Sequence, residues 1–320
     1  MKLLVTGGSG FLGSRLITKL VSGDHEVLAL ARSAASDDKL RALGATPVRG
    51  DLAGSALTLP AIDAVLHAAA HFRFAGPRAP YFRTNVDGTA ALLTAAETAG
   101  AKSFIYVSAA AVVMDDKGSP LRKANETAPT FPDSFSGYIA SKARGEAVVL
   151  AADKPGFRTL ALRPPGIWGP GDAFSREIPR AIGSGQFAFI DRGDYPCSTC
   201  HVDNVIEAIL CALTSGIGGR AYFVNDQEPT SFRDFIGSLA ALQGLSIDRV
   251  RSMPYGLAFF LGRLMELGAA VFSPDRDPPL SRSLVRLIGR DATTDDSAAR
   301  RDLGYIGHVS RAEGLASYKG

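Results

Sequence analysis

The sequence predicts an α/β protein with a doubly wound parallel sheet and a smaller C-terminal lobe. Short β-branched segments alternate with helical patterns through the first half, and a glycine-rich turn joins the first strand to the first helix. The alternation stops near Trp168, where Gly169-Pro170-Gly171-Asp172 breaks the chain. Strands separated by long helices pair in parallel, because a parallel connection needs a crossover. We expect a core over residues 1–168 and a lobe over residues 169–320, with late elements returning to the core.

The predicted elements follow from hydrophobic periodicity. Alternating or continuous apolar runs predict strands over Lys2–Thr6, Glu26–Leu30, Thr46–Arg49, Ala64–His67, Ser103–Val107 and Arg158–Leu162. Helical spacing predicts helices over Phe11–Val21, Ser36–Leu43, Tyr81–Ala99, Ser136–Ala152, Asp203–Leu213, Ser231–Leu242 and Gly256–Phe272. The last is an amphipathic lid or core helix by its pattern, with a partner face or peripheral membrane contact as alternatives. It is short for a bilayer span and is interrupted by Arg263 and Glu266.

Composition narrows the class of protein. The 320 residues carry 35 Lys and Arg against 32 Asp and Glu, a balance that does not suit a nucleic-acid-binding protein. Three cysteines cannot form a disulfide framework, and the chain opens Met1-Lys2 directly into an apolar strand without a leader pattern. We therefore expect a cytoplasmic enzyme without an integral membrane segment.

A glycine-rich loop lies between the first strand and the first helix. Gly7, Gly10 and Gly13 fit G-x-x-G-x-x-G, and Phe11 and Leu12 open the helix. Glycines allow a tight turn and close approach of a pyrophosphate, and the helix N-terminus offers free N–H groups. The loop predicts a dinucleotide site of the Rossmann type.

The residue after the second strand predicts which nucleotide binds. An NAD site needs a carboxylate there for the ribose 2′-hydroxyl, whereas this chain has Ala31 followed by Arg32, with Arg15 nearby in the first helix. A guanidinium pairs with a 2′-phosphate. NADP(H) is favoured, and NAD(H) stays open because Arg32 could simply be solvated.

An acid–base pair lies on one helix face. Tyr138 and Lys142 are one turn apart in Tyr138-Ile139-Ala140-Ser141-Lys142. A neighbouring ammonium favours the phenolate, so we expect Lys142 to lower the phenol pKa and Tyr138 to exchange protons near neutrality.

With these motifs the chain resembles the extended short-chain dehydrogenase/reductase family almost from end to end. Further matching segments are Asp51-Leu52, His67-Ala68-Ala69-Ala70, Thr84–Thr89, Arg163–Asp172 and His201–Val205. The segments Pro278–Arg282 and Ala299–Tyr305 are similar to the branch of 3β-hydroxysteroid dehydrogenases, sterol-carboxylate dehydrogenases and 3-oxoalkanoate reductases, with dihydroflavonol reductases close by.

The resemblance implies roles for individual residues. Tyr138 and Lys142 would be catalytic, and no metal is implied. Besides the glycine loop and Arg32, the implied nucleotide contacts are Asp51, Leu52, Ala68, Ala69, Ala70, Asn85, Ser108, Lys142, Pro165 and Ile167. The resemblance also implies a homodimer paired through the helices near Tyr81–Ala99 and Ser136–Ala152.

One residue departs from the family pattern. The second serine or threonine after the fifth strand, which hydrogen-bonds the substrate carbonyl in relatives, aligns with Ala109. Losing such a donor weakens stabilisation of the developing oxyanion. We expect Ser108, Thr130, Ser134 or Ser136 to compensate, or else a slow enzyme or an unusual substrate.

Three functions are weighed. The leading one is an oxidoreductase that interconverts a ketone and a secondary alcohol. A nucleotide-sugar epimerase or dehydratase is disfavoured, because Cys197 stands where relatives hold a diphosphate with Arg and alanines follow Ala109. A catalytically silent NADP(H)-binding sensor would explain Ala109 but not Tyr138 and Lys142. The Cys197-Ser198-Thr199-Cys200-His201 segment fits a haem-attachment pattern, which we discount in favour of a structural role.

The substrate is expected to be hydrophobic. The predicted pocket is bordered by residues 72–81, 113–134, 174–195 and the 256–272 helix. These segments and their neighbours supply Phe72, Phe74, Tyr81, Met114, Phe131, Phe135, Phe174, Phe187, Phe189, Phe259 and Phe260, of which about half are expected to be core. A sterol-like, polyketide-like or 3-oxoacyl compound suits such walls.

Overall fold

The computed structural model describes residues 1–54, 57–227 and 230–319, and its centre is a seven-stranded parallel sheet. The strand order is β12-β7-β5-β4-β1-β2-β3, which confirms the predicted doubly wound topology. The strands are β1 (Lys2–Thr6), β2 (Glu26–Ala31), β3 (Thr46–Arg49), β4 (Ala64–His67), β5 (Ser103–Val107), β7 (Arg158–Arg163) and β12 (Arg220–Phe223). All six strands predicted from the sequence are present.

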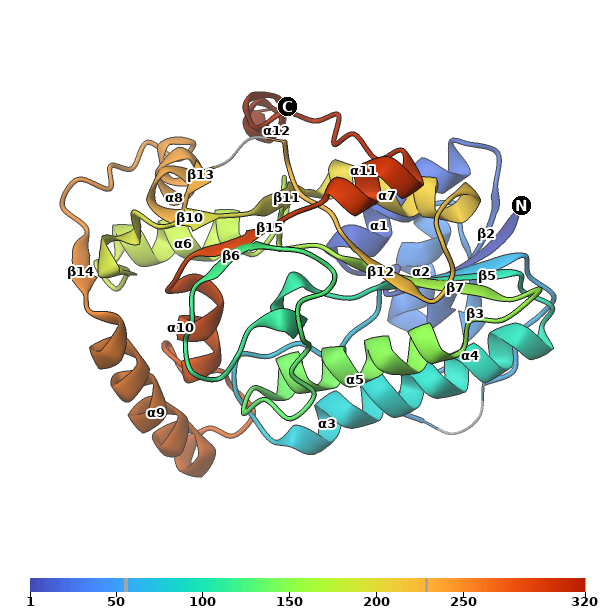
Figure 1. Cartoon of the computed structure of the whole chain (residues 1–320), viewed down its shortest axis with the longest axis horizontal. Coiled ribbons are helices and arrows are strands. Elements are labelled where there is room, and N and C mark those ends of the chain that lie inside the picture. The colour runs from blue at the N-terminus through green and yellow to red at the C-terminus, as the bar shows by residue number, and fades with distance from the viewer. Residues whose placement is uncertain (55–56, 228–229, 320) are drawn as a thin grey trace.

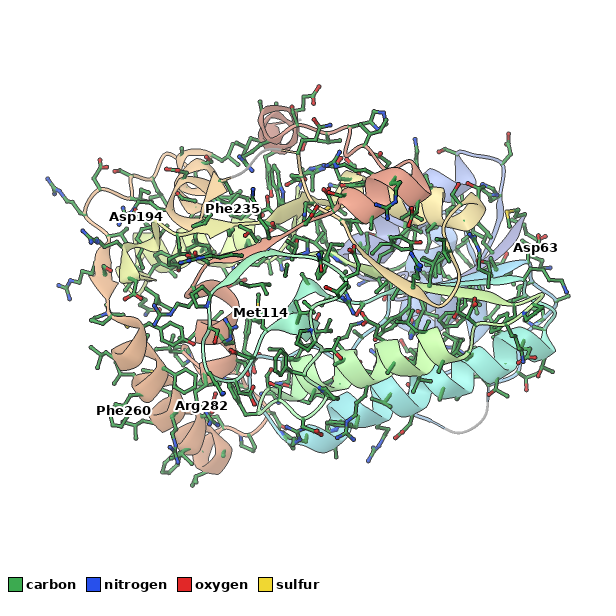
Figure 2. All side chains as sticks on the ribbon, viewed as in Figure 1. Asp63, Met114, Asp194, Phe235, Phe260 and Arg282 are labelled. Carbon is green, nitrogen blue, oxygen red and sulfur yellow. The ribbon has the colours of Figure 1, made fainter. Side chains whose placement is uncertain are left out.

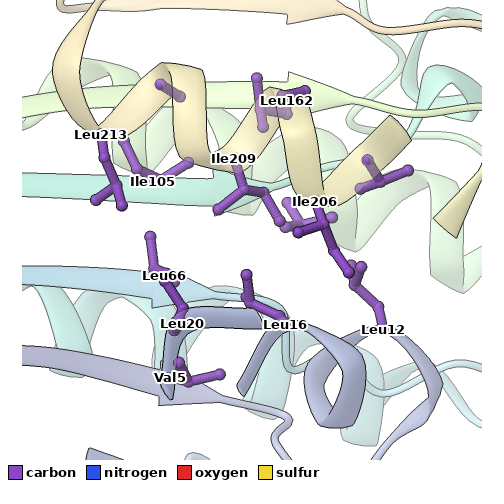
Figure 3. Packing of buried hydrophobic residues seen from close by; sticks show 14 of the residues in the cluster. Val5, Leu12, Leu16, Leu20, Leu66, Ile105, Leu162, Ile206, Ile209 and Leu213 are labelled. Atoms are coloured by element: carbon purple, nitrogen blue, oxygen red, sulfur yellow. The ribbon is translucent and has the colours of Figure 1, made fainter. Parts of the chain in front are cut away.

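Helices cover both faces of this sheet (Figure 1). One face carries α1 (Phe11–Val21), α2 (Ala34–Ala42), α7 (Val202–Thr214) and α11 (Ser297–Leu303). The other face carries α4 (Gly88–Thr98) and α5 (Gly137–Ala151), with the short α3 (Arg78–Phe82) continuing along it. Figure 3 shows leucines of α1 and isoleucines of α7 meeting side chains of four neighbouring strands in one apolar cluster. This packing fixes the strand ends, where the predicted site residues lie.

The predicted helix over Tyr81–Ala99 is interrupted. The chain forms α3, then a π-helical turn at Arg83–Asp87, then α4. A π-turn of this kind often occurs at functional sites. Here it carries the buried Asn85, whose amide holds a neighbouring loop. The next residue is Gly88. A Cβ atom there would lie 2.3 Å from the Leu52 carbonyl oxygen, so this position has no room for a side chain.

The C-terminal lobe consists of small sheets and helices. Its strands are β6 (Leu121–Ala124), β8 (Gly166–Trp168), β9 (Ala188–Ile190), β10 (Pro196–Cys197), β11 (Thr199–His201), β13 (Thr230–Ser231), β14 (Arg251–Met253) and β15 (Ala292–Thr294). Its helices are α6 (Phe174–Gly183), α8 (Phe232–Ala241), α9 (Tyr255–Phe272), α10 (Arg282–Ile288) and α12 (Arg311–Ala316). Most of its strand pairs join segments far apart in the chain, such as β15 with β6.

Late elements return to the core. α7 packs beside α1, β12 pairs with β7, and α11 adds Ala299 and Leu303 to the same apolar cluster. The carboxylate of Asp226 joins the two regions, since it accepts hydrogen bonds from the Trp168 indole and the Asn204 amide. The core and the lobe therefore share buried contacts.

Helix α9 stands at the edge of the molecule (Figure 1). It is the one helix in the described part of the chain that is long and apolar enough to cross a membrane, and 17% of it is buried. Its inner side packs closely on α10, because Gly262 leaves room for the backbone of Ser281 and Arg282.

Candidate active site

The glycine loop forms a close cradle at the carboxyl end of β1. Gly7 has a φ of 73°, and a Cβ atom there would lie 2.9 Å from the Ala69 nitrogen. A Cβ atom on Gly13 would lie 2.2 Å from the Gly7 carbonyl oxygen, so neither position accepts a side chain. Among the described residues no side chain caps α1, which leaves the N–H groups of Phe11 and Leu12 facing outward. These groups fit the pyrophosphate of a dinucleotide.

Other predicted nucleotide contacts lie along the same edge of the sheet. Asp51 is exposed after β3, where its carboxylate accepts the N–H of Ala53, and Leu52 is buried beside it. Ala68, Ala69 and Ala70 follow β4, and the Ala69 N–H is held by Thr6 Oγ1 at 3.1 Å. Pro165 and Ile167 lie at the end of β7 and in β8. Parallel strands end at one edge, so these segments border one crevice.

The two arginines near the end of β2 differ in their contacts. Arg32 is exposed immediately after β2 and is available to a ligand at the nucleotide end of the crevice. Arg15 instead donates to the Pro170 carbonyl oxygen at 2.8 Å and lies 4.0 Å from the Asp203 carboxylate. Arg15 is therefore engaged within the protein, and Arg32 remains the candidate for a 2′-phosphate.

Asn85 has a structural task in addition to its predicted one. Its buried side chain accepts the His71 N–H at 2.7 Å and donates to the His71 carbonyl oxygen and to Ser141 Oγ. The amide thus ties the loop after β4 to α5. Sequence reasoning missed His71, although it directly follows the Ala68–Ala70 segment. Any contact of Asn85 with a nucleotide stays a prediction.

Lys142 is almost fully buried in α5. Its ammonium nitrogen donates to the Val107 carbonyl oxygen at 2.6 Å and lies 4.0 Å from the centre of the Tyr106 ring. Burial lowers the pKa of Lys142 to about 7, and the Glu146 carboxylate one turn later opposes part of that shift. The residue therefore carries a proton that it can lose near neutrality.

Tyr138 lies at the start of α5 among apolar side chains. Its ring packs with Ala109, Ala111 and Met114, and meets the Phe72 ring edge-on at 4.7 Å between centroids. Burial raises the pKa of Tyr138 to about 12. The expectation that Lys142 lowers this pKa is wrong here, because desolvation of the phenol dominates and the ammonium faces Val107. The phenol consequently holds its proton at neutral pH.

Two of the four polar groups expected to replace the missing serine are engaged elsewhere. Ala109 is buried against Tyr138 and adds no hydrogen-bond donor through its side chain. Ser134 Oγ donates to the Asp116 carboxylate at 2.6 Å, and Ser136 Oγ caps α5 by accepting the Ile139 N–H. Ser108 and Thr130 differ from these two, since no hydrogen bond of either hydroxyl is found within the described ranges, and the Ser108 hydroxyl is buried. A buried unpaired hydroxyl fits contact with a bound ligand.

A buried ion pair positions the helix that carries Tyr138 and Lys142. Arg163 of β7 donates to both carboxylate oxygens of Glu146, at 3.0 and 2.6 Å, and both side chains are 4% exposed or less. Sequence reasoning missed this pair. The available signal was the spacing of Glu146 four residues after Lys142, which places both on one face of the helix.

A cavity of about 400 Å³ lies beside the active helix. It extends from Gly137, the residue before Tyr138, to the C-terminal half of α9. Its aromatic walls are Phe74, Tyr81 and Phe135. Because Phe72 touches both Phe74 and Tyr138, the apolar wall continues from the cavity to the phenol.

The predicted pocket walls are correct in part. Residues 72–81 and helix α9 border the cavity, whereas the stretches 113–134 and 174–195 do not. Phe187 and Phe189 instead pack in the core of the lobe, and Phe174 lies near Gly166. Phe260 is 58% exposed on the outer side of α9 (Figure 2).

Three charged residues of the cavity wall are paired. Arg282 bonds Glu266 of α9 and lies over the Phe135 ring, while Arg73 bonds Asp277.

The cysteine segment is part of the protein interior. The three cysteines are free, and burial raises the pKa of the Cys197 thiol to about 12. His201 caps α7 by accepting the Asp203 N–H through its ring nitrogen. Within the described residues no group of three or more His, Cys, Asp and Glu side chains could hold a metal ion. The geometry supports the structural interpretation of this segment.

The fold and the site define an NAD(P)-dependent oxidoreductase of the extended short-chain dehydrogenase/reductase class. Residues 4–255 match the model of the 3-beta hydroxysteroid dehydrogenase/isomerase family. The chain belongs to that family.

Curated relatives align over nearly the whole chain. A 4-hydroxy-2-methyl-3-oxo-4-farnesyl-3,4-dihydroquinoline-1-oxide ketoreductase of Stigmatella aurantiaca is 39% identical over 98% of this chain and 95% of its own length. A 2-alkyl-3-oxoalkanoate reductase of Stenotrophomonas maltophilia is 33% identical over 100% of this chain and 98% of its own length. Among solved structures, a dTDP-glucose 4,6-dehydratase of Streptomyces venezuelae with NAD bound matches with a TM-score of 0.75 and 26% identity, covering 99% and 95% of the two chains.

Proposed function

We propose that this enzyme interconverts a ketone and a secondary alcohol on a large hydrophobic molecule, with Tyr138 exchanging the proton at the substrate oxygen. The observation that carries the proposal is the surroundings of Tyr138, which are apolar side chains next to a cavity with aromatic and charged walls that begins at Gly137. Burial of apolar surface supplies most of the affinity in such a site. The substrate class is sterol-like, polyketide-like or 3-oxoacyl.

The names of the relatives support this substrate class. The Stigmatella protein is a ketoreductase for a farnesylated ring, and the Stenotrophomonas protein reduces an alkylated 3-oxoalkanoate. Both names describe a carbonyl group on a molecule that carries hydrocarbon.

The residues of this chain divide the remaining work. A bound nicotinamide supplies or accepts the hydride. In the reducing direction Tyr138 donates its proton to the carbonyl oxygen, and its pKa of about 12 keeps that proton available at neutral pH. Lys142 lies one turn further along α5 and would hold the nicotinamide ribose, which its buried position beside Val107 permits. Ser108 Oγ is the free hydroxyl closest in sequence to the position of Ala109.

Cofactor preference, assembly and location complete the proposal. The exposed Arg32 after β2 supports NADP(H) over NAD(H), and the glycine cradle fits either dinucleotide. A homodimer through α4 and α5 is proposed from the family resemblance, and α4 packs beside α5 along one face of the sheet. Light scattering at micromolar concentration would show twice the chain mass. A cytoplasmic location is proposed because the three free cysteines suit a reducing compartment.

Two alternatives are less well supported. A sugar-nucleotide enzyme needs a cation for the diphosphate, whereas Cys197 is half-buried and its thiol stays neutral because its pKa is raised to about 12. A catalytically silent NADP(H)-binding sensor would have no need of an ammonium group buried next to Val107 at the end of β5, as that of Lys142 is.

The test combines one variant with a substrate panel. Tyr138→Phe keeps the ring and removes the hydroxyl, so turnover of a hydrophobic ketone with NADPH should fall by roughly 10²–10⁴-fold. NADPH affinity should stay within about twofold, since the ring still fills its place. Wild-type turnover by Tyr138→Phe, or conversion of UDP-sugars in place of hydrophobic ketones, would reject the proposal.

A further inference from the structure

We propose that Tyr106 of β5 is a positioning residue, whose ring holds the ammonium group of Lys142 and stabilises its charged form. The ammonium nitrogen lies over the Tyr106 ring, 4.0 Å from the ring centre. Both side chains are buried, with 1% and 2% exposed. An ammonium over an aromatic ring is attracted by the negative charge of the ring face, and this attraction is stronger where water is excluded.

The close packing of α5 on β5 brings the two groups together. Gly145 lies three residues after Lys142, so both occupy one side of α5. A Cβ atom on Gly145 would lie 2.9 Å from the Tyr106 hydroxyl oxygen and 2.3 Å from the Asn85 carbonyl oxygen. A larger residue would therefore push α5 away from the strand. The glycine lets the helix approach closely enough for Lys142 to lie over the ring.

The charged groups near the ammonium only partly offset its burial. The Val107 carbonyl oxygen accepts one of its N–H groups at 2.6 Å. The Glu146 carboxylate favours the charged form, but both of its oxygens are bonded to the Arg163 guanidinium, whose positive charge opposes that effect. Tyr138 brings no negative charge at neutral pH, because burial raises its pKa to about 12. The Tyr106 ring is thus a source of stabilisation that adds no charge to the interior.

The histidine beside the ring adds no second positive charge. His67 of β4 packs against Tyr106 with 5.3 Å between the ring centroids. Its two ring nitrogens are bonded to Thr6 Oγ1 at 2.6 Å and to Thr89 Oγ1 at 2.9 Å. Burial and, to a smaller extent, the charge of Lys142 lower the pKa of His67 to about 3. The imidazole is therefore neutral at neutral pH and does not repel the ammonium.

The ring contact sets the pH range in which Lys142 can act. Burial lowers the pKa of Lys142 to about 7, so a small loss of stabilisation makes its amine neutral at physiological pH. A charged Lys142 can hold the nicotinamide ribose and attract the negative charge left on Tyr138 when its proton is donated. This consequence rests on the proposed function, whereas the contact between ring and ammonium does not.

The experiment measures the pKa of Lys142 directly. The full chain is labelled with isotope-enriched lysine, the Lys142 signal is assigned with Lys142→Met, and it is followed by nuclear magnetic resonance as the pH changes. Tyr106→Leu removes the ring, so the pKa of Lys142 should fall by about one pH unit. Tyr106→Phe keeps the ring face and removes a buried hydroxyl that has no partner among the described residues, so the pKa should stay nearly unchanged.

The matched control is Phe104→Leu. Phe104 is a buried aromatic residue two positions earlier on the same strand, and it packs against the same His67 ring with 5.7 Å between centroids. The ammonium of Lys142 lies over Tyr106 and not over Phe104. Phe104→Leu should therefore lower stability to a similar extent and leave the pKa of Lys142 where it is in wild type.

A second series avoids the cavity that leucine would leave. Tyr106 is replaced by phenylalanine and then by phenylalanines with increasing numbers of fluorine atoms, which withdraw negative charge from the ring face and nearly keep its shape. The pKa of Lys142 should fall stepwise along this series. The same pKa with every ring would overturn the inference. So would an unchanged or raised pKa in Tyr106→Leu, or an equal fall in Phe104→Leu.

Turnover distinguishes the positioning role from the proposed function. With a hydrophobic ketone and NADPH, the basic limb of the pH profile of kcat should move to lower pH in Tyr106→Leu by as much as the pKa of Lys142 falls. The limb of Phe104→Leu should not move. A lowered pKa with an unmoved limb would refute the positioning role. A stepwise fall of the pKa without ketone turnover by wild type would reject the proposed function and leave the contact between ring and ammonium standing.

Discussion

In the nucleotide-binding half and in the C-terminal lobe, the residues of the candidate site are brought together by different kinds of contact. In the first half, consecutive parallel strands end at one edge, so their connectivity alone gathers the glycine loop, Ala68–Ala70 and Ser108. In the lobe, the cavity depends on long-range contacts such as that of Glu266 with Arg282 and of Arg73 with Asp277. The comparison teaches that Tyr138 and Lys142 lie on a helix held by buried contacts, whereas the proposed substrate cavity is bordered by a peripheral helix with one ion pair to α10.

The largest expected effect comes from removing the buried ion pair between Glu146 and Arg163. Glu146→Ala leaves Arg163 buried without its carboxylate, which should lower the free energy of unfolding by about 3–5 kcal/mol. Denaturant unfolding followed by circular dichroism measures this. Lys154→Ala is the control, because its ion pair with Glu97 is half exposed and should contribute less than about 1 kcal/mol. Equal effects of the two variants would show that the buried pair does not hold α5.

The buried ammonium in the same helix gives the next effect, which depends on pH. The pKa of Lys142 is about 7 in the folded chain and 10.5 in the unfolded chain, so between these values the unfolded chain binds more protons. Wild-type stability should therefore rise with pH relative to Lys142→Met, by up to ~1.4 kcal/mol per pH unit from about pH 7 to 9. Lys2→Met, at an exposed site, should show no such trend. A flat or falling difference for Lys142→Met would contradict the depressed pKa.

The preference between NADPH and NADH depends on the nucleotide-binding half only, so it tests the contribution of that half separately. We expect wild type to bind NADPH at least tenfold more tightly than NADH, about 1.4 kcal/mol, because Arg32 is free to pair with a 2′-phosphate. Arg32→Ala should remove most of that difference without changing the KM for the ketone. Calorimetric titration of both nucleotides measures it, and equal wild-type affinities would refute the assignment.

The matching variant in the lobe should act on the substrate only. Glu266→Gln weakens the charged contact that holds α9 to α10, so the KM for a hydrophobic ketone should rise roughly three- to tenfold. NADPH affinity should not change, since Glu266 lies away from the glycine cradle. Steady-state kinetics and nucleotide titration separate the two, and a loss of NADPH affinity would mean that the regions are coupled.

The smallest expected effect concerns the missing donor. Ala109→Ser places a hydroxyl beside Tyr138, where it could stabilise both the substrate oxygen and the phenolate. We expect a few-fold rise in kcat for ketone reduction and a shift of the basic limb of the pH profile to lower pH. Ala111→Ser, in the same apolar cluster two residues on, is the control. No change in either variant's profile would show that this position does not reach the reacting atoms.

Sequence reasoning succeeded where the signal was local. The bounds of α1 match the prediction over Phe11–Val21, because the glycine loop and the apolar periodicity are both contained in that segment. The burial of Lys142 and its bond to Val107 join residues 35 positions apart, and the pairing of Glu146 with Arg163 depends on how α5 packs on β7. For α9 the pattern predicted an amphipathic helix, but apolar side chains such as Leu257, Phe260 and Leu264 are exposed, and the side that packs on α10 is set by tertiary contact.

The most direct test of the proposed function follows the hydride itself. Wild type is incubated with a hydrophobic ketone and NADPH carrying deuterium at the nicotinamide C4 position, and the alcohol product is analysed by mass spectrometry. We predict one deuterium on the carbinol carbon, and almost no product from Tyr138→Phe under the same conditions. An alcohol without deuterium, or equal yields from both proteins, would contradict hydride transfer assisted by the Tyr138 phenol.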